Sequence, residues 1–274
     1  MDSTPDEILI VGSSRVRGLR WRRYPGYWIN IAAKGGLTHE ELIKIVDEKI
    51  TEKTVLIILV CLQVELHSRT LSPSGEPGMV FANVTPNVEK IVYNISTADH
   101  RWKKTRNVHV IWVAPYTPNL LLLNEVRKRA RGWGSTLHHY EKEMSNYHMT
   151  VIDENRRRLV DKMKSAGLVV SDLTLLPHHL TREGDSDGLH LSDDAKFTLF
   201  AKVIEEGICF HKSGPPVVRE VGLLLDPEVR EAVTQVRRHK RRQQRTRAAE
   251  REIFKQLQIQ KDDKKNSNST APEA

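Results

Sequence analysis

The chain has 274 residues, enough for one large domain or two smaller ones, and a formal net charge of +8 at pH 7. The first 212 residues are nearly balanced, with 29 basic and 26 acidic residues, whereas residues 213–274 carry 14 basic and 9 acidic. This distribution predicts a nearly neutral globular domain followed by a basic extension. The longest apolar run, residues 55–62, is too short to cross a bilayer, which excludes a membrane span of that kind.

The start of the chain and its two cysteines bear on the compartment. The first seven residues are acidic and lack the basic start of a secretory signal. Cys61 and Cys209 each lie in an apolar context, which favours buried thiols over a disulfide framework. We therefore expect an intracellular protein, cytoplasmic or nuclear.

Strand and helix patterns alternate from the beginning of the chain. Residues 8–11 are all apolar, as in a strand buried on both faces, and a short helix is expected near residues 15–20. Residues 27–32 indicate a second strand, and a helix is expected to follow Thr38, which has capping-box spacing to Glu41. Residues 55–62 give the clearest buried strand.

The alternation continues to about residue 206. We expect a helix over residues 84–98, a strand over 108–113, helices over 119–131 and 135–147, a short strand over 149–152, and helices over 155–166 and 191–206. Such an order predicts an α/β fold with a parallel sheet and helices on both faces. Ligands of these folds bind beyond the carboxyl ends of the strands, where the turns after residues 11, 32 and 62 would meet.

The chain divides into three parts by composition. We expect a domain over residues 6–212, a basic and helical extension over 213–260, and a disordered tail over 261–274. The extension contains seven basic residues in an eleven-residue run without an acid. A run of this kind favours nucleic-acid binding or nuclear import at least as much as a solvated helix. The basic residues are Arg237, Arg238, Lys240, Arg241, Arg242, Arg245 and Arg247.

The turn after the first strand is a candidate for nucleophilic chemistry. Gly12 permits a tight turn, and Ser13 and Ser14 follow it. A serine hydroxyl at the start of a helix can act as a nucleophile while its own N–H holds an oxyanion. An ordinary serine cap of a helix is the alternative for this segment taken alone.

A second candidate segment precedes the last expected helix. Asp187 stands three residues before His190, so its carboxylate can accept from the imidazole Nδ1–H. That bond would leave Nε2 free to take a proton from a hydroxyl. The Asp-x-x-His spacing alone is common by chance. Its position late in an α/β chain makes it a stronger candidate for a functional site.

These two segments together resemble the SGNH (GDSL-type) hydrolase superfamily. The family's Gly-Asp-Ser motif stands here as Gly12, Ser13 and Ser14, with Ser13 in place of the family's aspartate, and its Asp-x-x-His block is matched by Asp187 and His190. The resemblance covers roughly residues 8–209 and implies a three-layer, flavodoxin-like α/β/α fold with a parallel sheet of about five strands. It further implies ester or acetyl hydrolysis, with Ser14 as nucleophile, His190 as base and Asp187 as its partner.

The resemblance also implies an oxyanion hole, in which the chain departs from the family. Gly36 matches the glycine whose N–H the family uses. The family's Gly-x-Asn-Asp block supplies an Asn amide, but this chain has Cys61-Leu62-Gln63-Val64, so Gln63 could replace the amide only with a shifted register. Losing one oxyanion donor costs about 3 kcal/mol of transition-state stabilisation.

Two functions therefore remain open at the level of sequence. One is a serine esterase or deacetylase acting on a short acyl ester. The other is a non-catalytic RNA- or DNA-binding protein on an SGNH-like scaffold, resembling OSK-type domains or the esterase-like domains encoded by retrotransposons. Basic stretches with a tryptophan at residues 15–23, 101–106 and 127–133 would also suit nucleic acid, although a solvated helix face is the commoner explanation. We expect no metal and no cofactor.

Overall fold

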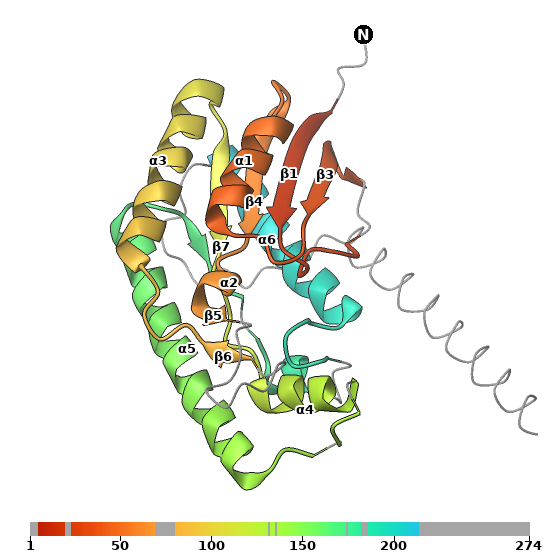
Figure 1. Ribbon diagram of the computed structural model, residues 1–274. Coiled ribbons are helices and arrows are strands. Elements are labelled where there is room, and N and C mark those ends of the chain that lie inside the picture. Colours follow the sequence, from red (N-terminus) through yellow and green to blue (C-terminus); the bar gives the residue numbers. More distant parts are fainter. Residues whose placement is uncertain are drawn as a thin grey trace, which may run out of the picture. The chain divides into compact units, whose positions relative to one another are not determined.

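The computed structural model describes residues 5–19, 23–68, 80–130, 132–134, 136–173, 175–181 and 186–213. These residues form a six-stranded sheet, with strand order β2-β3-β1-β4-β7-β8, and a separate two-stranded sheet. The five strands from β3 to β8 pair in parallel, and β2 is an antiparallel edge. Figure 1 shows the main sheet with helices in front of it and α6 behind it.

Six strands make up the main sheet, and the longer ones carry the apolar runs of the sequence. They are β1 (Asp6–Gly12), β2 (Arg23–Tyr24), β3 (Tyr27–Ala33), β4 (Thr54–Val60), β7 (His109–Val113) and β8 (Val170–Ser171). The small sheet pairs β5 (His67–Ser68) with β6 (Phe81–Ala82). Numbered along the chain, the five parallel strands stand in the order 2-1-3-4-5, which is the flavodoxin-like order.

This strand order fixes where a ligand can bind. The chain runs from β1 to β3 on one side, and then crosses to β4 on the other side of β1. Such a switch point leaves a crevice outside the carboxyl ends of the two central strands. Here those ends are Gly12 and Val60, which pair in register.

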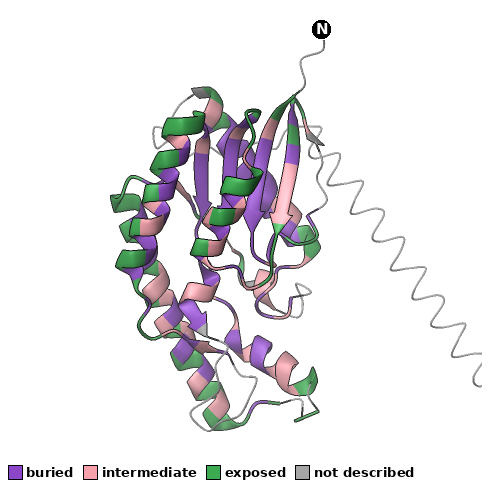
Figure 2. Ribbon diagram, turned by 45° about the horizontal axis from the view of Figure 1, so that its top comes forward, coloured by how far each residue is buried: buried purple, intermediate pink, exposed green. Residues whose placement is uncertain are grey.

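Alternate residues of each central strand enter two different cores. Leu9 and Val11 of β1 face one cluster, while Ile8 and Ile10 face the other, because successive strand residues point to opposite faces. Helices α1 (His39–Lys49), α3 (Val88–Arg106) and α5 (His139–Ser165) pack on the first face, and α6 (Asp193–Ser213) packs on the second. Figure 2 shows the central strands β1 and β4 buried along most of their length between these layers, whereas β3 is mostly of intermediate exposure. The expected three-layer α/β/α fold is confirmed.

The remaining helices are short or lie beyond the sheet. They are α2 (Gln63–Leu66), α4 (Leu120–Ala130) and the 3-10 helix η1 (Pro177–Leu180). The predicted capping box at the start of α1 is present, with the Thr38 side chain accepting from the Glu41 N–H and Glu41 accepting from the Thr38 N–H. In the part of the chain that the structure describes, no helix is long and apolar enough to cross a membrane.

Several sequence predictions of elements are wrong. Residues 149–152, expected as a strand, lie inside the single helix α5, which also replaces the two helices expected on either side of them. A run of only four residues cannot be assigned by period alone, and here Ile152 is buried on the same helix face as His148. The true fifth parallel strand, β8, consists of only two paired residues and has no pattern of its own.

The boundaries of other elements also differ from expectation. The helix expected over residues 84–98 is α3, which begins four residues later and ends at Arg106, and the last helix begins at Asp193 and ends at Ser213. The short helix expected near residues 15–20 is absent among the described residues, since residues 14–18 form successive turns instead. Cys61 is buried as expected, but Cys209 is exposed.

The predicted C-terminal parts lie outside the described residues, except for the last residue of α6. This applies to the extension beyond Ser213, to the tail at 261–274 and to the seven basic residues between positions 237 and 247.

The turn that carries Ser14 depends on Gly12. A Cβ atom at this position would lie 2.7 Å from the Val60 carbonyl oxygen and 2.9 Å from the Val60 Cβ. We therefore expect Gly12→Ala to lower the free energy of unfolding by about 2 kcal/mol, as overpacking between fixed strands does. Urea unfolding measures this. Gly35→Ala is the matched control, because a Cβ there meets only the flexible end of Arg17 at 3.6 Å, and a loss as large as that of Gly12→Ala would contradict the prediction.

Candidate active site

Ser14 lies in the turn that leaves β1 at the sheet's carboxyl edge. The Ser13 N–H donates to the Val60 carbonyl at 2.9 Å, and the Val16 and Arg17 N–H groups donate back to Ser13 and Ser14. These bonds close a tight turn against β4 without forming a helix. Ser14 is only partly buried.

The loop before α6 carries the other two residues. Gly188 has a φ of +88°, and a Cβ there would lie 2.4 Å from the Asn119 carbonyl oxygen. The Asn119 N–H donates to the Gly188 carbonyl at 2.7 Å, and the Ser186 hydroxyl donates to the His190 carbonyl at 2.7 Å. Glycine at position 188 therefore lets the loop pack tightly against the start of α4.

Ser14, His190 and Asp187 form a continuous hydrogen-bonded chain. The Ser14 Oγ lies 2.8 Å from the His190 Nε2, and the His190 Nδ1 lies 2.8 Å from the Asp187 Oδ2. Asp187 Oδ1 accepts from the N–H groups of Leu189 and His190 at 2.8 and 2.6 Å. The side chains of His190 and Asp187 are about one third exposed, so a substrate in solution can reach them.

The charge of Asp187 sets the tautomer of His190. Burial alone would raise the pKa of Asp187, but the hydrogen bonds from the His190 ring and from the two backbone N–H groups lower it to about 2. An ionised carboxylate can only accept, so the neutral imidazole carries its proton on Nδ1. Nε2 then accepts from the Ser14 hydroxyl, which is the arrangement that a general base needs.

Gly36 lies in the turn between β3 and α1 with a φ of +69°, a conformation that favours glycine. The Lys34 N–H donates to the Gly12 carbonyl at 3.0 Å, which joins this turn to the end of β1. No hydrogen bond links Gly36 to Ser14 among the described residues. The structure thus brings Gly36 to the same edge of the sheet as the Ser14 turn.

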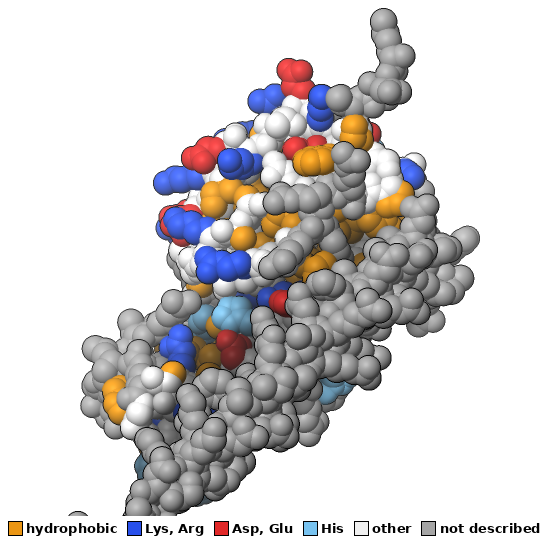
Figure 3. All heavy atoms as spheres, turned by 90° about the vertical axis from the view of Figure 1, so that its right-hand side faces the viewer, with side chains coloured by type: hydrophobic (Ala, Val, Ile, Leu, Met, Phe, Trp, Pro, Cys, Tyr) orange, Lys and Arg blue, Asp and Glu red, His pale blue; other side chains and the backbone are white. Residues whose placement is uncertain are grey.

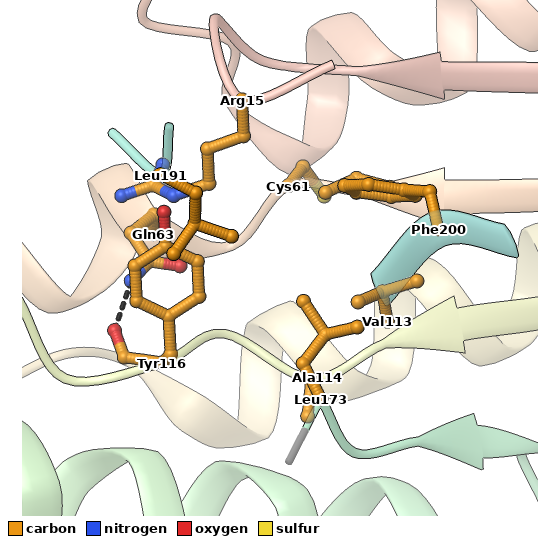
Figure 4. Close-up of a pocket in the computed structure, with 10 residues that line it drawn as sticks. Arg15, Cys61, Gln63, Val113, Ala114, Tyr116, Leu173, Leu191 and Phe200 are labelled. Carbon is orange, nitrogen blue, oxygen red and sulfur yellow. Dashed lines mark hydrogen bonds between the residues drawn. The ribbon is translucent and has the colours of Figure 1, made fainter. Parts of the chain in front are cut away.

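Gln63 takes a different place from the one its sequence position suggested. Its side chain is buried at 1% exposure, and its amide Nε2 donates to the backbone carbonyl of Tyr116. The dashed line in Figure 4 marks this bond between α2 and the segment after β7. The Gln63 amide therefore links α2 to the segment that follows β7.

Sequence reasoning missed Arg15 and Tyr116. Arg15 was expected in a solvated basic stretch, but it is 5% exposed, with its guanidinium carbon 4.9 Å from the centre of the Tyr116 ring. The Tyr116 hydroxyl donates to the Leu189 carbonyl at 2.6 Å and so supports the loop of His190. No local pattern distinguishes a buried arginine from an exposed one, although the position directly after Ser14 was a possible signal.

A second missed pair joins the turn of Gly36 to α2. The His39 Nδ1 lies 2.6 Å from a Glu65 carboxylate oxygen, which also accepts from the His39 N–H at 3.1 Å. Burial tends to raise the pKa of Glu65, but these bonds to His39 lower it overall. Glu65 therefore fixes the start of α1, directly after the turn of Gly36.

The tryptophans of the other two predicted basic stretches, residues 101–106 and 127–133, differ in burial. Trp102 is buried, with its Nε1 donating to Asp47 at 2.7 Å, and Trp112 is buried with its Nε1 donating to Asp99. These tryptophans belong to the core, whereas Trp133 is 47% exposed.

Among the described residues, no three His, Cys, Asp or Glu side chains gather as a metal-holding group.

The lowered pKa of Asp187 gives a pH-dependent term in stability. Because its folded pKa of about 2 lies below the ordinary value of 3.8, Asp187 stabilises the fold above about pH 4, and this contribution is lost as the pH falls toward 2. The urea midpoints of the natural protein and Asp187→Asn should therefore differ most above pH 4 and converge near pH 2. Asp194→Asn, at an exposed site, is the control, and a constant difference for Asp187→Asn would contradict the assignment.

No protein-family model matches the chain, and no curated protein sequence is significantly similar to it. Solved structures with a similar fold include a lipase/acylhydrolase from Enterococcus faecalis, with 17% identity, covering 78% of this chain and 100% of that one at a TM-score of 0.46. A carbohydrate acetylesterase from Sinorhizobium meliloti has 12% identity, covering 75% and 99% at a TM-score of 0.45. An aryl esterase from M. smegmatis has 10% identity, covering 73% and 97% at a TM-score of 0.44.

Similarity at this level says nothing about the substrate of this chain. The fold follows instead from the strand order 2-1-3-4-5, with the Gly-Ser-Ser turn after the first strand and the Asp-x-x-His loop before the last helix. These three features are the ones that the resemblance to the SGNH hydrolases implies, and the structure has all three in a flavodoxin-like α/β/α fold.

Proposed function

We propose that the protein is a serine hydrolase of the esterase or deacetylase type that acts on a short acyl ester. The observation that carries this proposal is the hydrogen-bonded chain from the Ser14 Oγ through both nitrogens of His190 to Asp187, with each ring contact at 2.8 Å. A binding protein has no need of a serine held on a histidine that is itself oriented by an ionised carboxylate.

The chemistry follows from these contacts. The Ser14 oxygen attacks the acyl carbon while its proton passes to the His190 Nε2. Asp187 stabilises the imidazolium that forms, and His190 then gives the proton to the leaving alcohol as the ester bond breaks. Water then attacks the acyl-serine while one of its protons passes to the same nitrogen, and the Ser14 oxygen takes that proton back as the bond to the acyl group breaks and the acid is released.

The oxyanion would be held mainly by backbone groups. Within the described part of the chain, the Ser14 N–H donates no hydrogen bond, so it is available to the developing charge. Gly36 supplies the second N–H in this proposal, from the turn that Glu65 and Lys34 fix. The Gln63 amide donates to Tyr116, so we assign it no part in holding the oxyanion. With two N–H donors instead of three, we expect turnover two to three decades lower, because one donor is worth about 3 kcal/mol of transition-state stabilisation.

Replacement of the nucleophile tests the proposal. We expect Ser14→Ala to lower kcat for a short acyl ester by about a thousandfold, since removing one member of such a chain disables the others. The measurement is hydrolysis of an acetyl ester by the purified protein. Ser13→Ala is the control, because it removes the neighbouring buried hydroxyl, and it should keep most of the activity. Equal rates for the natural protein and Ser14→Ala would refute the proposal.

Nucleic-acid binding is the second candidate, and it rests on the basic run at residues 237–247. In Figure 3, the Lys and Arg side chains on the displayed face of the described residues are mixed with acidic ones. That face therefore offers no uniformly basic surface, and the candidate depends on the run itself. Both activities could reside in one chain.

The dependence of affinity on salt tests this second candidate. Each phosphate contact contributes a slope of about −0.9 for a duplex or about −0.7 for a single strand to the plot of log affinity against log salt concentration. Replacing Arg241, Arg242 and Arg245 with Gln should then reduce the slope by about two to three. A flat plot for the natural protein, with either RNA or DNA, would contradict the candidate.

A further inference from the structure

Arg15 is a buried charge that the proposed mechanism does not use. Its side chain is 5% exposed, and among the described residues no carboxylate lies within ion-pair distance of it. The guanidinium carries a full positive charge. Burying a charge in this way lowers the stability of a fold, and an apolar side chain of similar volume is often at least as stable in its place. Core packing alone therefore does not explain an arginine at this position.

The contacts of Arg15 lead to Tyr116. The Arg15 Nη1 donates to the Ser13 Oγ at 3.4 Å, within the turn that carries Ser14. The guanidinium carbon lies 4.9 Å from the centre of the Tyr116 ring, and the Arg15 side chain also donates a hydrogen bond to the tyrosine. In Figure 4 the Arg15 side chain comes from the turn after β1 and reaches the hydroxyl end of the Tyr116 ring. Arg15 thus connects the turn of the nucleophile to the segment after β7.

Tyr116 continues this connection to the loop of His190. Burial raises the pKa of the Tyr116 hydroxyl more than Arg15 lowers it, so the hydroxyl keeps its proton and donates to the Leu189 carbonyl at 2.6 Å. Leu189 directly precedes His190, and its own N–H donates to the Asp187 Oδ1 at 2.8 Å. One series of contacts therefore runs from the turn of the nucleophile to the loop of the base.

The backbone around Tyr116 is held by other parts of the fold. The Gln63 amide donates to the Tyr116 carbonyl, and the Arg156 Nε donates to the Pro115 carbonyl at 2.6 Å. These two donors belong to α2 and α5, and neither helix carries a residue of the proposed catalytic chain. The scaffold therefore fixes the Tyr116 ring independently of the two segments that it contacts.

We propose that Arg15 and Tyr116 are positioning residues that hold Ser14 and His190 at the distance that proton transfer needs. This inference rests on the proposed hydrolase function. The two catalytic side chains come from segments 176 positions apart, so their alignment depends on contacts between those segments. A misplacement of about 1 Å between reacting groups can lower a rate about a hundredfold. A firm link between the segments therefore serves catalysis even where a buried charge lowers stability.

The first experiment removes the Tyr116 hydroxyl and keeps the ring. Tyr116→Phe leaves the Leu189 carbonyl without this donor, and we expect kcat for a short acyl ester to fall about ten- to a hundredfold with KM nearly unchanged. Tyr27→Phe is the matched control, because Tyr27 is buried to a similar degree at the amino end of β3, and it should keep kcat. Equal kcat values for the two variants would overturn the proposal.

The second experiment separates positioning from stability. Arg15→Met removes the charge and keeps an unbranched side chain, so we expect kcat to fall while the urea midpoint stays the same or rises. Adding Tyr116→Phe should lower kcat no further than the more damaging single substitution does, because both changes break one link. An unchanged kcat in Arg15→Met, or a urea midpoint that falls together with kcat, would overturn the proposal.

A third measurement distinguishes failure of this proposal from failure of the proposed function. Crystal structures of the natural protein and Tyr116→Phe give the distance between the Ser14 Oγ and the His190 Nε2 without any turnover. We expect about 2.8 Å in the natural protein and a distance about 1 Å longer in the variant. The same distance in both would overturn the positioning role alone, whereas equal hydrolysis by the natural protein and Ser14→Ala would overturn the hydrolase function.

Discussion

The hydrogen bond between Ser14 and His190 joins residues 176 positions apart, and the candidate site exists only where that contact is made. The parallel pairing of β1 with β4 brings the Ser14 turn to the carboxyl edge of the sheet. Packing of Gly188 against Asn119 brings the His190 loop to the same edge from the other end of the chain. Two close backbone approaches, each at a glycine, therefore set the geometry of the site.

Polar contacts behind the three residues hold the segments that carry them. Tyr116 supports the loop of His190 through the Leu189 carbonyl, and Gln63 in turn donates to the Tyr116 carbonyl. Glu65 fixes the start of α1 after the turn of Gly36. The residues of the divergent block thus contribute to the shape of the site.

Arg15 places a buried positive charge beside Ser14, and no carboxylate lies within ion-pair distance of it among the described residues. A buried cation favours negative charge developing nearby, but it also destabilises the fold. The same residue shows why a run of basic residues is a weak guide to a surface, because Arg15 is buried while Arg17, two positions later, is exposed.

The sequence by itself determined the parallel α/β layers, the central strands and the candidate trio, because long apolar runs and short motifs are local properties. It could not determine β8, whose two paired residues have no period, or the unbroken α5, where residues 149–152 suit a strand as well as a helix. Only the tertiary structure decided that Ser14 meets His190, that the Gln63 amide donates to Tyr116, and that Arg15 points inward. Each of these depends on contacts between distant segments, and burial and hydrogen-bond partners are properties of the packed chain.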